Sequence, residues 1–224
     1  MPGFIKICGI RDAETAVAAA AAGASHLGFV FFPKSPRFID AAAAEDIVTE
    51  VKRAAFDQGF DAPGFVGLFV DAGERALAEA APFLTHFQFH GRESPERCAA
   101  MGRQFGLGVI KAVPVGAAED AAGAAAFADA ADMILFDARP PRSADRPGGH
   151  GAAFDWALLR AYEGETPFAL AGGLAPDTVA AAVAAVKGLA GFEGVDVSSG
   201  VESAPGVKDA RLIAAFVAAA KAAF

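Results

Sequence analysis

The chain has 224 residues, of which 54% are hydrophobic and 21% charged, and it contains two cysteines. This composition is too apolar for an intrinsically disordered protein and too poor in cysteine for a disulfide scaffold. The formal net charge of −8 disfavours nucleic acid and an anionic membrane surface as partners, because both reward a basic face.

The first predicted strand, Phe4–Cys8, begins almost at once. No basic region precedes an apolar core there, so we expect no secretory signal, a cytoplasmic location, and free thiols at Cys8 and Cys98. No later stretch approaches about 20 uninterrupted bulky apolar residues, so no membrane span is expected.

Short apolar runs then alternate with Ala-rich stretches along the chain. The runs lack a regular alternation of polar residues, which is typical of strands buried on both faces of a parallel sheet. The predicted strands are Phe4–Cys8, His26–Phe31, Phe65–Val70, His86–Phe89, Leu107–Lys111, Met133–Phe136, Phe168–Leu170 and Gly194–Val197.

Helical patterns lie between these strands. Several begin at a capping residue or a first-turn proline, namely Asp12, Asp40, Ser94-Pro95 and Pro176-Asp177. The predicted helices are Asp12–Ala22, Ala41–Ala54, Glu74–Ala81, Pro95–Gln104, Ala117–Ala128, Asp177–Val186 and Lys208–Ala222.

Alternating strands and helices predict either an open doubly wound sheet or a closed eight-stranded barrel. A nucleotide-binding open sheet would place G-x-G-x-x-G after the first strand, but the sequence there is Cys8-Gly9-Ile10-Arg11. Eight units in about 200–250 residues favour the barrel. No linker divides the chain and no internal repeat is evident. We therefore predict one α/β domain over residues 1–224, a (βα)8 TIM barrel of eight parallel strands with outer helices.

Two glycine-containing loops follow the last two strands. Gly172-Gly173 comes after the seventh strand and Ser199-Gly200 after the eighth. Glycine lets the backbone approach an anion closely, and these two loops are the usual phosphate site of this fold. We expect them to bind phosphate, although each alone also fits an ordinary left-handed turn.

The first strand ends in Cys8, at the end of the barrel where chemistry is expected. A cysteine in an apolar strand is usually inert packing, but a nearby cation can ease ionisation of its thiol. Lys6 lies two residues earlier and projects to the same face. A buried lysine needs an anionic partner, and the first and eighth strands are neighbours in a closed barrel, so we predict that Asp196 pairs with Lys6. Cys98 falls in a helical pattern and is expected to be packing.

Asp137 follows the apolar residues of the sixth strand. It can serve as a turn cap, but in the barrel it would face Cys8 across the mouth. An acid and a base on opposite sides of one ligand suit a proton-transfer isomerisation. The long segment Ala138–Gly151 that follows is a candidate lid.

Arg37, held between prolines beside the mouth, is either a solvated loop cation or a two-pronged clamp for a carboxylate. We also expect His90 and His150 to line the pocket, whereas His26 starts a strand at the opposite end. The histidines lack metal-ligand spacing, and neither a Ser–His–Asp pattern nor a P-loop occurs, so no metal is predicted.

Taken together, a series of motifs resembles the phosphoribosylanthranilate isomerase family of tryptophan biosynthesis, from the first strand to the last helix. The most specific are the start Lys6-Ile-Cys8-Gly9 and the segment Gly194-Val-Asp-Val-Ser-Ser-Gly-Val-Glu202. The others are Gly28-Phe-Val-Phe31, Ser35-Pro-Arg37, Val66-Gly-Leu-Phe-Val70, Gln88-Phe-His-Gly91, Leu135-Phe-Asp137, Gly148-Gly-His-Gly151, Phe154-Asp-Trp156 and Leu170-Ala-Gly-Gly-Leu174.

The resemblance implies an Amadori rearrangement of N-(5'-phosphoribosyl)anthranilate to its 1-deoxyribulose 5-phosphate isomer. By this resemblance Asp137 is the general acid that opens the furanose ring, and Cys8 the general base that removes the C2′ proton. Arg37 corresponds to the contact with the anthranilate carboxylate, and the loops at Gly172-Gly173 and Ser199-Gly200 to the phosphate site. Lys6, His90 and Asp196 are supporting residues. No cofactor is implied.

The sequence departs from the family pattern at His150, where Thr or Asn is commoner, at Phe89, and at Thr178. These positions support the site and leave the acid and the base intact. The only expected partner is the small phosphosugar substrate. The sequence is compatible with a monomer or a homodimer.

Two other functions stay open. The chain can be another phosphosugar enzyme on the same barrel, such as a decarboxylase, an epimerase or the next enzyme of the pathway, and Lys111 at the predicted end of the fifth strand supports that alternative. It can also be a non-catalytic phosphate-binding protein, although the presence of both Cys8 and Asp137 speaks against this.

Overall fold

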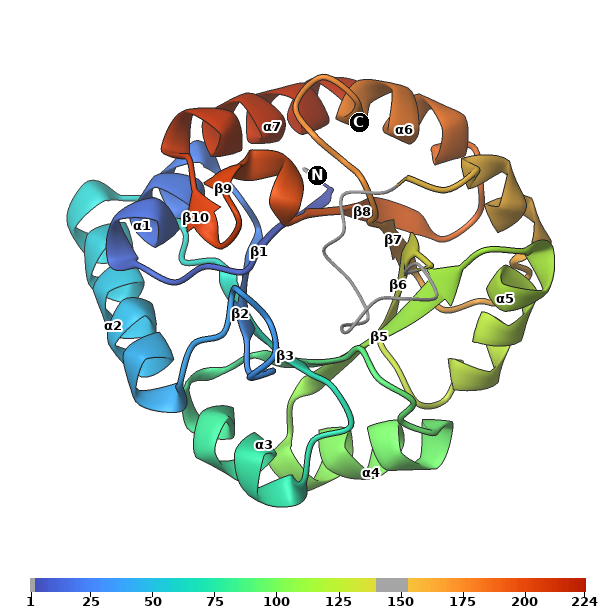
Figure 1. Cartoon of the computed structure of the whole chain (residues 1–224), viewed down its shortest axis with the longest axis horizontal. Coiled ribbons are helices and arrows are strands. Elements are labelled where there is room, and N and C mark those ends of the chain that lie inside the picture. Colours follow the sequence, from blue (N-terminus) through green and yellow to red (C-terminus); the bar gives the residue numbers. More distant parts are fainter. Residues whose placement is uncertain (1–2, 140–152) are drawn as a thin grey trace.

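The computed structural model describes residues 3–139 and 153–224, and these form a closed barrel of eight parallel strands with helices outside (Figure 1). Each strand pairs with the next in chain order, and the eighth closes on the first, where Lys6 stands opposite Asp196. The predicted (βα)8 fold is confirmed. The barrel strands are β1 (Phe4–Cys8), β2 (His26–Val30), β3 (Gly64–Phe69), β4 (His86–Phe89), β5 (Gly108–Val115), β6 (Met133–Ala138), β7 (Phe168–Leu170) and β8 (Phe192–Val197).

The helices surround these strands as a ring (Figure 1). Three predicted caps are confirmed, because the side chains of Asp12, Asp40 and Ser94 each accept a hydrogen bond from a backbone N–H in the first turn. The α-helices are α1 (Ala13–Ala22), α2 (Ala41–Gln58), α3 (Glu74–Ala80), α4 (Pro95–Phe105), α5 (Ala118–Gly123), α6 (Val179–Val186) and α7 (Ala210–Ala223). Short 3-10 helices are η1 (Ala81–Phe83), η2 (Ala124–Phe127), η3 (Trp156–Ala161) and η4 (Ser199–Val201).

Four predicted helices were wrong in detail. Helix α2 runs to Gln58, four residues past its predicted end at Ala54. The stretch predicted as one helix over Ala117–Ala128 divides into α5 and the tighter η2. Helix α6 begins two residues later than predicted, since the Thr178 hydroxyl accepts from the Ala175 N–H and holds the preceding residues in a turn. The last helix begins at Ala210, capped by Asp209, because the preceding residues form a small antiparallel pair of strands, β9 (Glu202–Ala204) and β10 (Val207–Lys208).

Strand β5 extends to Val115, four residues past its predicted end, so Lys111 lies in its middle. Its neighbours Ile110 and Ala112 point into the barrel, and alternation along the strand therefore turns Lys111 outward. There its Nζ lies 3.0 Å from Glu93 Oε2 and 2.8 Å from the Gly91 carbonyl. The position of Lys111 contradicts the alternative phosphosugar enzyme, which would need a catalytic lysine at the end of the fifth strand.

The core has an inner and an outer part. The larger part lies between the sheet and the helices and contains the phenylalanines of the outward-facing strand positions, such as Phe65, Phe87 and Phe136. Inside the barrel the apolar residues form two smaller clusters, one around Ile110 and Leu135 and one that contains Cys8. Cys8 therefore lies on the inner face, as its strand position predicts. None of the helices in the described ranges is long and apolar enough to cross a membrane.

A hydrogen bond repeats along the amino end of the barrel. In each case the donor is the backbone N–H of the second residue of an odd-numbered strand. The acceptor is the side-chain oxygen of the residue just before the next, even-numbered strand. These bonds tie the strands together in pairs, a periodicity that the residue types do not reveal. The bonds are Ile5 N to Ser25 Oγ (2.8 Å), Phe65 N to Thr85 Oγ1 (2.8 Å) and Val109 N to Asp132 Oδ2 (2.7 Å).

Candidate active site

The inner face of β1 carries Lys6 and Cys8, packed against the backbone of β2. A Cβ added at Gly28 would lie 3.0 Å from Cys8 Sγ and 3.1 Å from Lys6 Cε. Contacts at these distances are tight, so a larger residue at position 28 would require Cys8 or Lys6 to shift by a few tenths of an ångström.

The predicted pair between Lys6 and Asp196 is present. Lys6 Nζ donates to Asp196 Oδ1 at 2.7 Å, and the lysine is fully buried. Burial alone would lower the pKa of Lys6, but Asp196 and Cys8 favour its charged form, and the net effect raises this pKa. Removing one partner of such a buried pair costs roughly 3–5 kcal/mol of stability, because the other charge is left unpaired.

The electrostatic environment of Cys8 opposes its ionisation. Burial raises the pKa of the Cys8 thiol, and the nearby Asp196 acts in the same direction. Lys6 and Lys208 act in the opposite direction without reversing the effect of burial. The thiol form therefore predominates near neutral pH, and the two lysines are the groups that can stabilise a thiolate.

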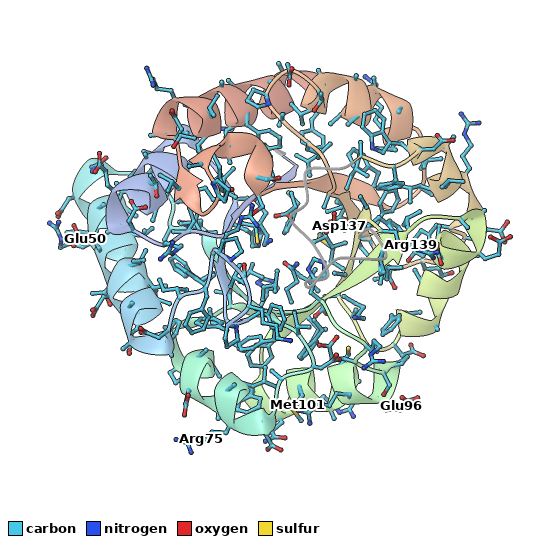
Figure 2. The ribbon with its side chains drawn as sticks, viewed as in Figure 1. Glu50, Arg75, Glu96, Met101, Asp137 and Arg139 are labelled. Carbon is cyan, nitrogen blue, oxygen red and sulfur yellow. The ribbon has the colours of Figure 1, made fainter. Side chains whose placement is uncertain are left out.

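Asp137 lies at the carboxyl end of β6, next to the middle of the ring of strands (Figure 2). Its Oδ1 accepts from the Ala138 N–H at 2.8 Å, and its Oδ2 lies 3.3 Å from His90 Nε2. His90 in turn lies 3.2 Å from the amide nitrogen of Gln88, through its Nδ1. Both carboxyl oxygens of Asp137 thus have a partner that fixes the orientation of the group.

Gly172 packs directly onto this carboxyl group. It has φ +82°, and a Cβ there would lie 2.6 Å from the Ala138 nitrogen and 3.0 Å from Asp137 Oδ1. Glycine is therefore required both by the backbone conformation and by the closeness of Asp137.

The phosphate-site prediction concerns the loops that follow β7 and β8, and these loops touch. A Cβ added at Gly200 would lie 1.9 Å from the carbonyl oxygen of Leu174. Within the described residues, the backbone N–H groups of Gly172, Gly173, Ser199 and Gly200 donate no hydrogen bond. Adjacent unpaired N–H groups of this kind suit an anion.

Arg37 clamps a carboxylate in this structure, and that carboxylate belongs to the protein. Its Nε donates to Glu202 Oε1 at 2.7 Å and its Nη2 to Oε2 at 2.8 Å. Both side chains are buried, at 6% and 4% exposed. The stem of Arg37 lies across Gly9, where an added Cβ would be 2.6 Å from Arg37 Cδ, so the guanidinium is held beside the end of β1.

Lys208 completes this group. Its Nζ donates to Glu202 Oε1 at 2.8 Å and to the Ser198 carbonyl at 2.9 Å. Burial lowers the pKa of Lys208, although Glu202 opposes this; burial alone would raise the pKa of Glu202, but Arg37 and Lys208 hold it below its usual value. The sequence pattern predicts neither role, because Glu202 only ends a motif of the family resemblance and Lys208 falls in a predicted helix.

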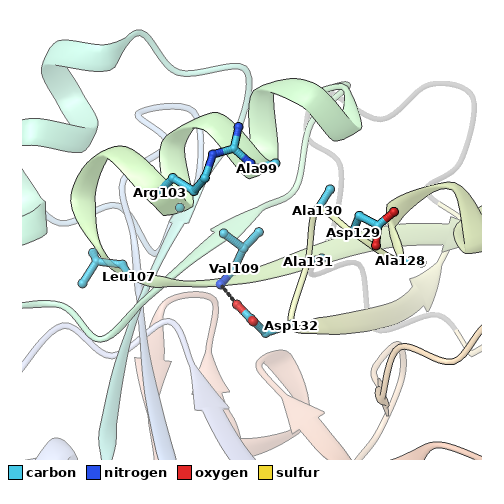
Figure 3. Close-up of a pocket in the computed structure, with 10 residues that line it drawn as sticks. Ala99, Arg103, Leu107, Val109, Ala128, Asp129, Ala130, Ala131 and Asp132 are labelled. Carbon is cyan, nitrogen blue, oxygen red and sulfur yellow. Dashed lines mark hydrogen bonds between the residues drawn. The ribbon is translucent and has the colours of Figure 1, made fainter.

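Two pockets among the described residues lie away from the carboxyl ends of the strands. One, of about 330 Å³, lies outside the barrel between α4 and the segment before β6, where Asp132 binds Val109 (Figure 3). The other, of about 360 Å³, lies at the amino end and is lined by His26 and His86. Burial lowers the pKa of His26 to about 3, so this histidine is neutral at physiological pH. Neither pocket includes Cys8 or Asp137.

No group of three or more His, Cys, Asp or Glu residues within ranges 3–139 and 153–224 is arranged to hold a metal ion. Cys8 and Cys98 are both free thiols, as predicted. Most of the predicted lid, including His150, lies outside the described residues. Cys8 and Asp137 lie at the carboxyl ends of β1 and β6, and His90 directly follows β4. The predicted glycine loops follow β7 and β8, whereas Lys6 and Asp196 pair within β1 and β8.

Comparisons with known proteins give a consistent result. Residues 5–219 match the family model described as N-(5'phosphoribosyl)anthranilate (PRA) isomerase. The N-(5'-phosphoribosyl)anthranilate isomerase of Rhodospirillum rubrum is 47% identical over 220 residues, covering 97% of each chain.

Solved structures agree. The phosphoribosyl anthranilate isomerase of Thermotoga maritima has a TM-score of 0.81 at 34% identity, covering 97% of this chain and 98% of that one. A second similar structure, with a TM-score of 0.78 at 32% identity and the same coverage, is a phosphoribosyl anthranilate isomerase in complex with reduced 1-(o-carboxyphenylamino)-1-deoxyribulose 5-phosphate. The chain therefore belongs to the N-(5'-phosphoribosyl)anthranilate isomerase family and is an isomerase of tryptophan biosynthesis.

Proposed function

We propose that this chain converts N-(5'-phosphoribosyl)anthranilate to 1-(2-carboxyphenylamino)-1-deoxyribulose 5-phosphate by general acid/base catalysis, with Asp137 as the acid and Cys8 as the base. The observation that carries the proposal is that both side chains occupy inward-facing positions at the carboxyl ends of their strands, in a chain of this family. Neither side chain requires a cofactor for this chemistry.

The proposed sequence begins at Asp137. Its carboxylic acid protonates the furanose oxygen, the C1′–O bond breaks, and the substrate nitrogen forms a Schiff base with C1′. The hydrogen bond from the Ala138 N–H and the contact with His90 hold the carboxyl group in one orientation for this transfer. His90 is in this proposal a positioning residue.

The thiolate of Cys8 then removes the C2′ proton, and the substrate becomes an enolamine. Lys6 and Lys208 are the cations that favour the thiolate against the effect of burial. Tautomerisation to the ketone releases one proton from the C2′ hydroxyl and adds one at C1′. Both side chains can thereby regain their starting protonation states, and the isomerisation consumes no proton.

The substrate is an anion at both ends, and two parts of the site suit it. We propose that the N–H groups of Gly172, Gly173, Ser199 and Gly200 bind the phosphate. Arg37 contacts the anthranilate carboxylate. The Lys6–Asp196 pair supports the inner wall beside Cys8.

The chain acts, in this proposal, as a single catalytic domain in the cytoplasm, with no nucleic-acid partner, which agrees with its net charge of −8. All the proposed site residues come from one chain, so a monomer and a homodimer would both be active.

The test is the loss of phosphoribosylanthranilate fluorescence after addition of the purified protein, with the Asp137→Asn variant as the matched control. We expect a decay that depends on the concentration of the wild-type protein and is absent with the variant. A wild-type protein that leaves the fluorescence unchanged would refute the proposed function.

A further inference from the structure

The guanidinium of Arg37 has two edges that can each bind a carboxylate with two parallel hydrogen bonds. One edge presents Nε and Nη2, and the other presents Nη1 and the second proton of Nη2. Glu202 occupies the first edge through both of its oxygens. Among the described residues, nothing accepts a hydrogen bond from Nη1, so the second edge is unoccupied.

The charges around this arginine do not balance. Arg37 and Lys208 are two cations, and both bind the one carboxylate of Glu202, whose Oε1 accepts from Arg37 Nε and from Lys208 Nζ. All three side chains are buried. The nearby Lys6 is already paired with Asp196. The cluster of Arg37, Glu202 and Lys208 therefore carries one positive charge in excess, and a buried charge of this kind favours an anionic ligand.

The hairpin of β9 and β10 holds this cluster against the loop that carries Arg37. Glu202 and Lys208 stand opposite each other in the hairpin. Gly206, between its strands, has φ +80°, and a Cβ there would lie 2.5 Å from the Pro36 carbonyl oxygen. The hairpin thus packs directly on the residue before Arg37, which restricts the position of the guanidinium.

We propose that Glu202 and Lys208 are positioning residues that make the site specific for a substrate carboxylate. Glu202 holds one edge of the Arg37 guanidinium so that the adjacent edge is fixed to receive the substrate's carboxylate with two hydrogen bonds. Lys208 neutralises the negative charge of Glu202, so that Glu202 does not cancel the positive charge that Arg37 presents to the substrate. This inference rests on the proposed function, since it takes the anthranilate carboxylate as the group that is recognised.

The test compares two substrates that differ only in that group: N-(5'-phosphoribosyl)anthranilate and N-(5'-phosphoribosyl)aniline, which lacks the carboxylate. For the wild-type protein we expect a higher kcat/KM with the carboxylated substrate. In the Glu202→Gln variant this kcat/KM should fall about 10- to 100-fold, mainly through KM, as expected for a charge-assisted contact. The kcat/KM for the aniline compound should change by less than about threefold.

Lys208→Met should lower kcat/KM for both substrates, because Lys208 also favours the Cys8 thiolate. The loss should be larger for the carboxylated substrate, because the variant leaves Arg37 and Glu202 as a neutral pair. Glu93→Gln is the matched control: it also breaks a buried carboxylate–lysine pair, with Lys111, but on the outside of the barrel. It should change kcat/KM for both substrates by the same factor. Arg37→Lys keeps the charge and lacks the two flat edges, so it should lose selectivity even if Glu202→Gln does not fold.

Equal losses on both substrates in Glu202→Gln, or in Arg37→Lys if the former is unfolded, would overturn the inference and indicate a structural role. A wild-type protein that turns over both substrates equally well would also overturn it, while leaving the proposed isomerase activity intact. A wild-type protein inactive on both would instead refute the proposed function.

Discussion

Replacing Gly172 by alanine tests whether the orientation of Asp137 limits catalysis. The new Cβ would lie 2.6 Å from the Ala138 nitrogen and 3.0 Å from Asp137 Oδ1, so the carboxyl group or its strand end must move. A displacement of about 1 Å in a reacting group can cost about 10²-fold in rate. Since φ at this position is +82°, the substitution also costs roughly 1–2 kcal/mol of stability.

Gly59→Ala separates these two effects. Gly59 caps α2 with φ +74°, and a Cβ there would meet nothing within 4 Å. Gly59→Ala should therefore show the stability loss that φ alone causes, and Gly172→Ala should show that loss plus the cost of its close contacts. Each kcal/mol corresponds to about 2–4 °C in melting temperature. The assay is kcat and KM from the fluorescence decay at a temperature where both variants are folded. We expect kcat to fall about 10²-fold in Gly172→Ala alone. If Gly172→Ala keeps the kcat of Gly59→Ala, the reasoning that places Asp137 at the reacting centre is wrong.

Five further outcomes are expected. Asp137→Asn should abolish turnover while calorimetry still detects binding of the reduced product analogue; unchanged activity would exclude the acid role. Cys8→Ala should lower kcat by about 10²–10⁴-fold, and a loss below tenfold would point to another base. Because burial raises the pKa of Cys8 and the thiolate is the active form, wild-type activity should increase with pH above neutrality. Gly200→Ala, which collides with the Leu174 carbonyl, should raise KM and weaken inhibition by inorganic phosphate, and an unaltered phosphate inhibition constant would count against that site. Burial raises the pKa of Cys98 to about 11, above its value in the unfolded chain. The free energy of unfolding should therefore decrease as pH rises from about 9 to 11, because the unfolded state loses this proton first. Urea unfolding should show a smaller loss in Cys98→Ala, and equal losses would contradict this sign.

The strands were predictable because a parallel barrel buries both faces of each strand, and this produces apolar runs that are easy to recognise. The end of β5 was not predictable, since Ala112-Val-Pro-Val115 after Lys111 reads equally well as a loop. The start of α6 was misplaced because Pro176 and Asp177 suit both a first helical turn and a tight turn, and the hydroxyl of Thr178 decides for the turn.

The candidate site was predictable to the extent that it follows from strand order. The pairing of Lys6 with Asp196 required only that the first strand lie beside the last, and it is confirmed. The partner of Arg37 could not be predicted, because Glu202 lies 165 residues away on a hairpin with no recognisable strand pattern. Contacts made by irregular segments depend on how the loops pack, which residue spacing does not encode.

The repeated hydrogen bond at the amino end of the barrel also divides the molecule into modules. Ser25, Thr85 and Asp132 each link one odd-numbered strand to the even-numbered strand that follows it, and each such pair forms a unit. A fragment made of whole units keeps these hydrogen bonds. A cut inside a unit leaves a buried N–H of Ile5, Phe65 or Val109 unpaired. Split proteins divided after α2 or α4 should accordingly reassemble from their two halves more readily than those divided after α1 or α3.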